Sequence, residues 1–80
     1  MLSGKNILLT GGAGSVGRKL IPGFLDQDPS VLRILDNNES GLAEIRSNID
    51  DSRCRYLAGD VRDKERLSRA MEDIDIVIHT

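Results

Sequence analysis

The sequence predicts an α/β fold built on a parallel sheet, and three observations lead to this prediction. Short apolar runs typical of buried strands alternate along the chain with longer segments of helical periodicity. A glycine-rich stretch, residues 10–17, follows the first apolar run directly, and Asp36 closes the second. With right-handed crossovers, we expect the order β-α-β-α-β-α-β to form a sheet with strand order 3-2-1-4 and helices on both faces.

Four segments are expected to be strands because they are short and rich in apolar, often β-branched, side chains. In chain order they are residues 5–10, 31–36, 55–58 and 74–80. Near-continuous apolar strands are typical of parallel sheets that helices cover on both sides. The strand order places the last of them at an edge, where an apolar strand invites further pairing. We therefore expect residues 1–80 to be the N-terminal half of a larger domain.

The first expected helix runs from Ser15 to about residue 27. Its apolar face is expected to contain Val16, Leu20 and Phe24, with Ile21 and Leu25 beside them. Pro22 lies inside this helix and has no N–H to donate to the carbonyl of Arg18. We expect a kink or a break at this position.

Two further helices are expected between the later strands. Ser40 is the expected N-cap of a helix that continues to about Asn48, and Asp63 is the expected N-cap of the last helix. The residues expected to face the sheet are Leu42, Ile45 and Ile49 in one helix and Leu67, Ala70, Met71 and Ile74 in the other.

Composition excludes several classes of protein. The net charge is −2, and basic residues are scattered among acidic ones, so the chain has no basic stripe for nucleic acid. No segment reaches the ~20 apolar residues of a membrane span, and we expect no secretory signal. Cys54 is the only cysteine, and His79 lacks companions at metal-ligand spacing. We expect a cytoplasmic protein without a metal site.

Residues 10–17, with the sequence TGGAGSVG, carry the strongest functional signal. Early glycines permit a sharp turn, Gly14 lets backbone approach phosphate oxygens, and Gly17 allows close packing of helix on strand. The helix N-terminus then presents free N–H groups to an anion. This pattern predicts a pyrophosphate site for NAD or a relative. A phosphate-loop NTPase fits poorly, because Arg18 and Lys19 stand where that motif needs Lys and then Ser or Thr.

Asp36 follows Gly17 by 19 residues, close to the spacing at which a carboxylate reaches the adenosine ribose. A 2′-phosphate would be repelled by this acid, and Asn37 rather than Arg follows it, so NAD is expected and NADP is less favoured. The alternative is a strand-terminal Asp that only caps a turn. Arg18 is expected to be a solvated surface side chain, the alternative being an approach to the pyrophosphate, and His79 is expected to be a hydrogen-bonded group near the cofactor loop.

These motifs resemble the N-terminal part of extended short-chain dehydrogenase/reductases, in particular nucleotide-sugar epimerases and dehydratases of polysaccharide biosynthesis. The Thr-Gly-x-x-Gly-x-x-Gly motif, Ile34–Asn37, Gly59–Asp63 and Ile76–His79 carry the resemblance, in the family's order. It implies a partial Rossmann (doubly wound) fold in which Asp60 and Val61 approach the adenine. The expected cofactor-binding residues are Thr10, Gly11, Gly14, Ser15, Val16, Gly17, Asp36, Asn37, Asp60 and Val61.

The resemblance also implies a Tyr-x-x-x-Lys catalytic pair, which these residues lack: Tyr56 is the only tyrosine, and Asp60 stands four positions later. We expect no catalytic residue here, and expect the rest of a longer protein to bind the nucleotide-sugar substrate and to form any homodimer. The alternatives are a non-catalytic dinucleotide sensor of the atypical short-chain dehydrogenase group and a truncated scaffold without function.

Overall fold

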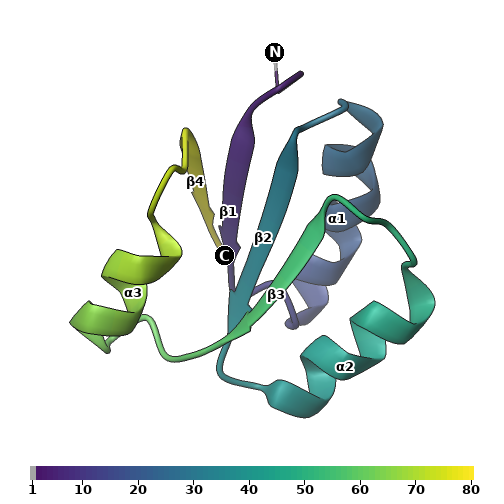
Figure 1. Cartoon of the computed structure of the whole chain (residues 1–80). Helices are drawn as coiled ribbons and strands as arrows, with labels where there is room; N and C mark the ends of the chain where they lie inside the picture. Colours follow the sequence, from purple (N-terminus) through teal and green to yellow (C-terminus); the bar gives the residue numbers. More distant parts are fainter. Residues whose placement is uncertain (1) are drawn as a thin grey trace.

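Four parallel strands form one sheet in the computed structural model, which describes residues 2–80 (Figure 1). The strands are β1 (Asn6–Thr10), β2 (Val31–Asp36), β3 (Cys54–Ala58) and β4 (Ile76–His79). Their order is β3-β2-β1-β4, and in the central register Leu8 of β1 lies between Arg33 of β2 and Val77 of β4. The fold class and strand order predicted from the sequence are confirmed.

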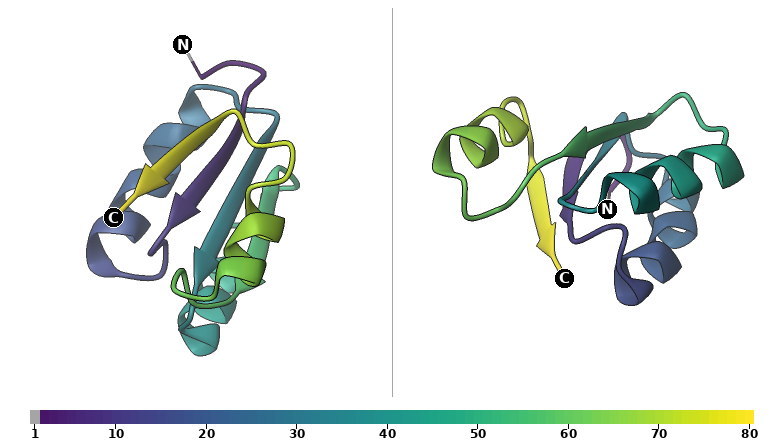
Figure 2. Two further views of the ribbon diagram at one scale, coloured as in Figure 1. Left: turned by 90° about the vertical axis from the view of Figure 1, so that its left-hand side faces the viewer. Right: turned by 90° about the horizontal axis from the view of Figure 1, so that it is seen from below.

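The helices are α1 (Ser15–Asp26), α2 (Glu39–Asn48) and α3 (Lys64–Ala70). Helices α1 and α2 cover one face of the sheet and α3 covers the other (Figures 1 and 2). Because strand side chains alternate between faces, Ile7 and Leu9 pack in the α1/α2 core while Leu8 packs in the α3 core. Burial on both faces explains why β1 is almost wholly apolar.

The buried face of α1 differs from the expected one. Gly17 and Ile21 are buried, whereas Val16 is 61% and Leu20 37% exposed. The close approach of Gly17 to the preceding turn sets the rotation of the helix and turns Val16 outward. Helix α1 also continues through Pro22 without a break, since the ring lies on the exposed side and removes a single hydrogen bond.

Helix α2 begins earlier than expected, because Asn38 rather than Ser40 is its N-cap. The Asn38 Oδ1 atom accepts from the backbone N of Gly41 at 3.0 Å and from the hydroxyl of Ser40 at 2.9 Å. Asp63 caps α3 as predicted, accepting from the N of Arg66. Met71, expected on the buried stripe of α3, is instead its C-cap and 46% exposed.

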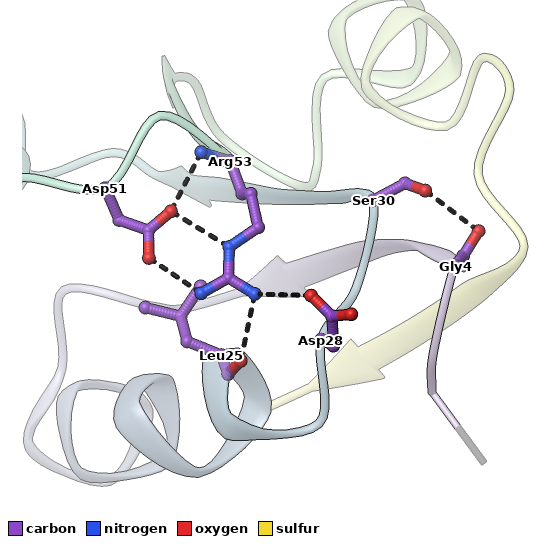
Figure 3. Close-up of polar contacts among 6 residues, drawn as sticks. All are labelled: Gly4, Leu25, Asp28, Ser30, Asp51 and Arg53. Atoms are coloured by element: carbon purple, nitrogen blue, oxygen red, sulfur yellow. Dashed lines mark hydrogen bonds and ion pairs between the residues drawn. The ribbon is translucent and has the colours of Figure 1, made fainter.

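An arginine organises the amino end of the sheet, where the strands begin (Figure 3). The guanidinium of Arg53 is clasped by both carboxylate oxygens of Asp51 and donates to the carbonyl of Leu25 near the end of α1, at 3.0 Å. It also pairs with Asp28. These contacts lower the pKa of Asp51 to about 2, chiefly through the side-chain hydrogen bond from Arg53. The cluster joins α1, the segment before β2 and the segment before β3.

Candidate functional site

The glycine-rich turn links the end of β1 to the start of α1 and is closely packed. Gly11 has φ +70°, and a Cβ added there would lie 2.8 Å from the Thr80 carbonyl oxygen. At Gly17 an added Cβ would lie 2.5 Å from the Gly11 oxygen and 2.7 Å from the Gly12 Cα. Only glycine fits at either position without movement of backbone atoms.

The helix start behind this turn is open to a ligand. Gly14 is the N-cap of α1 and is exposed, so no side chain caps the helix. The first turn of α1 contains no acidic residue. The first N–H groups of a helix have no acceptor within it, and their partial positive charge suits an anion. The exposed residues Ser15 and Val16 place their backbone at this position.

Asp36, at the end of β2, holds the turn in place. One oxygen of its carboxylate accepts from the backbone N of Ala13 at 2.9 Å, and the other accepts from the backbone N of Asn38 at 2.9 Å. A carboxylate oxygen has two lone pairs, so each retains capacity for a further donor. Asp36 therefore fixes the turn and the start of α2 while remaining able to accept from a ligand.

A cavity of about 210 Å³ opens beside Asp36, at the carboxyl end of the sheet. In a doubly wound sheet, this is the end at which ligands bind. The residues lining the cavity are Gly11, Leu35, Asp36, Asn37, Gly59, Asp60, Val61, His79 and Thr80. They come from the carboxyl ends of β2 and β4 and from the residues that follow all four strands, which lie far apart in sequence but adjacent in the sheet.

Asp60 carries its own counter-ion on this cavity wall. Its carboxylate accepts hydrogen bonds from the Nε and Nη2 atoms of Arg62 and from the backbone N of Arg62. The distance from Nη2 to Oδ2 is 2.7 Å. These hydrogen bonds lower the pKa of Asp60 to about 2, and the side-chain bond from Arg62 has the largest effect. Asp60 is therefore ionised at neutral pH, and each of its oxygens already accepts two hydrogen bonds from Arg62, so a further N–H donor would have to displace one of them.

The structure brings five of the ten predicted cofactor residues to the cavity wall: Gly11, Asp36, Asn37, Asp60 and Val61. Gly14, Ser15, Val16 and Gly17 lie at the adjoining helix start instead. Thr10 is only 2% exposed, and its hydroxyl lies 2.5 Å from Nδ1 of His79. Thr10 therefore does not line the cavity itself, but its hydroxyl holds His79, which does. His79 is hydrogen-bonded, as expected.

Several contributors were missed by the sequence analysis. The Ala13 N–H and Thr80 contribute through backbone contacts and register, which residue type alone does not indicate. Arg18, expected to be solvated, is half-buried: its Nε donates to the Ala13 carbonyl at 2.8 Å, and Nη1 pairs with Glu44 of α2. The register of β4 against β1 would have indicated the position of Thr80. Because His79 lies opposite Thr10, the next residue, Thr80, lies beside Gly11.

Other reactive side chains lie away from this cavity. Burial raises the pKa of Tyr56 to about 12 and also raises that of Cys54, which favours the protonated form of both groups at neutral pH. Within residues 2–80, no three His, Cys, Asp or Glu side chains gather as metal ligands would. In the same part of the chain, no helix has the length and apolar character needed to cross a membrane.

Comparison with curated proteins gives two informative relatives. A protein from Methanocaldococcus jannaschii described as an uncharacterized membrane protein is 44% identical over 75 residues, covering 94% of this chain and 22% of the relative. A UDP-N-acetylglucosamine 4,6-dehydratase (inverting) from Campylobacter jejuni is 46% identical over 80 residues, covering 99% and 24%. The chain thus spans about a quarter of the length of these relatives.

Solved structures show the same similarity. Pen from Bacillus thuringiensis superposes with a TM-score of 0.96 at 33% identity, over 100% of this chain and 25% of its own. The Bordetella bronchiseptica enzyme WbmF, in complex with NADH, gives a TM-score of 0.76 at 26% identity, over 98% and 23%. The family described as polysaccharide biosynthesis protein matches residues 7–80, nearly the whole chain. The chain therefore belongs to this family, among the nucleotide-sugar epimerases and dehydratases of the extended short-chain dehydrogenase/reductases.

Proposed function

We propose that the chain binds the adenosine and pyrophosphate half of NAD as part of a nucleotide-sugar epimerase or dehydratase. The proposal rests chiefly on Asp36, which contacts both the glycine-rich turn and the cavity. Its carboxylate orders the glycine-rich turn through Ala13 and at the same time lines the cavity that Asp60 and Val61 close. A ribose at Asp36 would have phosphates at the start of α1 on one side and a base at Asp60 on the other.

The residues present fit such a ligand. Gly14 leaves the helix start open, and an added Cβ there would meet only the Gly11 oxygen, at 3.3 Å. Pyrophosphate can approach backbone N–H groups at this point without a side chain in the way. Asp36 has acceptor capacity for ribose hydroxyls. Ionised Asp60 can accept from an exocyclic amino group that replaces a hydrogen bond from the exposed Arg62 side chain.

Bound nicotinamide dinucleotide supplies hydride transfer, whereas the residues of this chain bind and orient it. We further propose that residues 1–80 act as the N-terminal half of a dinucleotide-binding domain. The hydroxyl of Tyr56 is buried, and no lysine follows Tyr56 four positions later, so the acid/base groups and the contacts to a nucleotide sugar would come from elsewhere in a longer protein. The dehydratase relative supports a UDP-sugar as the substrate class.

A titration of the amide NMR spectrum with NAD tests the binding proposal. We expect saturable shifts at residues 11–17, Asp36 and Asp60, and unchanged resonances around Arg53 at the opposite end of the sheet. Asp36→Asn should weaken NAD binding about tenfold to a hundredfold, since it replaces a charged acceptor of ribose hydroxyls. Asp26→Asn, an exposed substitution at the end of α1, is the matched control and should leave the Kd unchanged.

The absence of saturable shifts with NAD, NADP or ADP at millimolar concentration would refute the proposal for this chain. Equal weakening by Asp36→Asn and Asp26→Asn would also contradict it, because the effect would then reflect overall charge. Since Asp36 also orders the turn, circular dichroism and the dispersion of the free-protein spectrum must show that Asp36→Asn remains folded.

A further inference from the structure

Arg18 is bound to the same residue of the glycine-rich turn that Asp36 holds in place. Ala13 donates its backbone N–H to Asp36 Oδ2 at 2.9 Å and accepts Arg18 Nε at its own carbonyl at 2.8 Å. Arg18 and Asp36 are therefore joined through the backbone of a single residue. The two bonds to Ala13 hold the Asp36 carboxylate and the Arg18 guanidinium within about 10 Å of each other, roughly one Debye length, a range over which charges near a protein surface still interact.

That guanidinium is already paired. Glu44 of α2 accepts from Arg18 Nη1. Helix α2 reaches the turn because Gly41 packs directly against Ala13: a Cβ added to Gly41 would lie 2.9 Å from the Ala13 Cβ. Glu44 follows Gly41 by three residues, on the same side of the helix. The close Ala13–Gly41 contact thus places a carboxylate against the cation beside the proposed ribose site.

Two other arginines of the carboxyl half of the chain, Arg46 and Arg62, have partners of their own. Arg62 pairs with Asp60, and Arg46 of α2 stacks over the ring of Tyr56 at 5.0 Å from its centroid. The charged groups that face Arg18 through hydrogen bonds or through Ala13 are therefore Glu44 and Asp36. Glu44 contacts the Arg18 guanidinium directly and Asp36 is linked to it through Ala13, so the three side chains together have a net negative charge.

Resting on the proposed dinucleotide site, we infer that Glu44 is a specificity-determining residue that disfavours a 2′-phosphate by neutralising Arg18. A phosphate monoester carries about −1.5 to −2 charges at neutral pH, whereas the 2′-hydroxyl of NAD carries none. Glu44 both occupies donors of Arg18 and adds a negative charge near that position. The exclusion of NADP is thereby shared between Asp36 on the sheet and Glu44 on the covering helix.

Measurement of Kd for NAD and NADP in Glu44 variants tests this inference. Glu44→Gln should tighten NADP binding about twofold to fivefold, the range expected for a partly exposed ion pair, and leave NAD within about 1.5-fold. Glu44→Lys should lower the Kd for NADP further than Glu44→Gln does. Glu39→Gln, the same substitution on the exposed first turn of α2, is the matched control and should change neither Kd. In the double variant Arg18→Gln/Glu44→Gln, the gain should disappear.

The outcomes separate the two proposals. If wild-type protein binds NAD but Glu44→Gln changes both nucleotides by the same factor or neither, the role of Glu44 is refuted and the site stands. Equal NADP gains in Glu44→Gln and Glu39→Gln also refute it, since net charge alone would then explain them. If neither nucleotide binds wild-type protein, the site is refuted, and the inference about Glu44 with it.

Discussion

Gly17→Ala is expected to destabilise the chain strongly, although alanine is normally the better helix former. The added Cβ would lie 2.5 Å from the Gly11 oxygen and 2.7 Å from the Gly12 Cα. Both are backbone atoms of a turn that Asp36 and Thr80 hold in place, so they cannot swing aside as a flexible side chain could. Overpacking typically costs about 1–3 kcal/mol, and these contacts place Gly17→Ala near the upper limit, at about 3 kcal/mol.

Gly23→Ala supplies the matched control within α1. Nothing lies within 4 Å of a Cβ added at Gly23, so the substitution should stabilise the chain by about 0.5–1 kcal/mol through helix propensity and reduced freedom of the unfolded chain. Urea unfolding followed by circular dichroism measures both effects. With a slope of about 1 kcal/mol per M, Gly17→Ala should lower the midpoint by about 3 M. A Gly17→Ala midpoint equal to or above wild type would refute the packing argument.

The remaining predictions concern acid stability and helix capping. The pKa of Asp51 is about 2, below its ordinary 3.8, so its stabilising contribution is complete above pH 4 and is lost as the pH falls toward 2. Asp51→Asn should lower Tm at pH 6 and flatten the decline of Tm between pH 4 and pH 2; an unchanged slope would contradict the role of the Arg53 pair. Asn38→Ala should lower the free energy of unfolding in urea by about 1 kcal/mol, because Asn38 caps the helix through Gly41. Ser40→Ala should lower it by less than half of that. Equal losses of stability would show that the capping assignment is wrong.

The sheet and its strand order could be predicted because each step depended on local patterns. Apolar runs, the glycine-rich turn and alternation with helices fix a parallel order without long-range detail. The buried face of α1 could not be predicted in this way. A face through Val16 and Leu20 and a face through Gly17 and Ile21 are both compatible with helical periodicity, and the choice depends on the contact of Gly17 with Gly11 and Gly12.

The cavity wall was predictable only in part, for a related reason. Asp36 and Asp60 end or follow apolar strands, so their side chains could be placed at the carboxyl edge of the sheet. Arg18 has its partners in Ala13 and in Glu44, which lies 26 residues away, and helical periodicity gives no indication of that pair. Asn38 and Ser40 are both good capping residues two positions apart, and the backbone conformation at Asn38 decides between them.

The two ends of the sheet couple stability to binding differently. At the amino end, Arg53 joins α1 to the segments before β2 and β3 (Figure 3). Arg53 does not line the cavity. At the carboxyl end, Asp36 and Gly17 hold the turn that shapes the proposed site. Substitutions at Asp51 or Arg53 should therefore lower Tm while the NAD affinity of the folded fraction stays constant. Substitutions at Gly17 should lower both, because there the contacts that stabilise the fold also position the backbone that would bind phosphate.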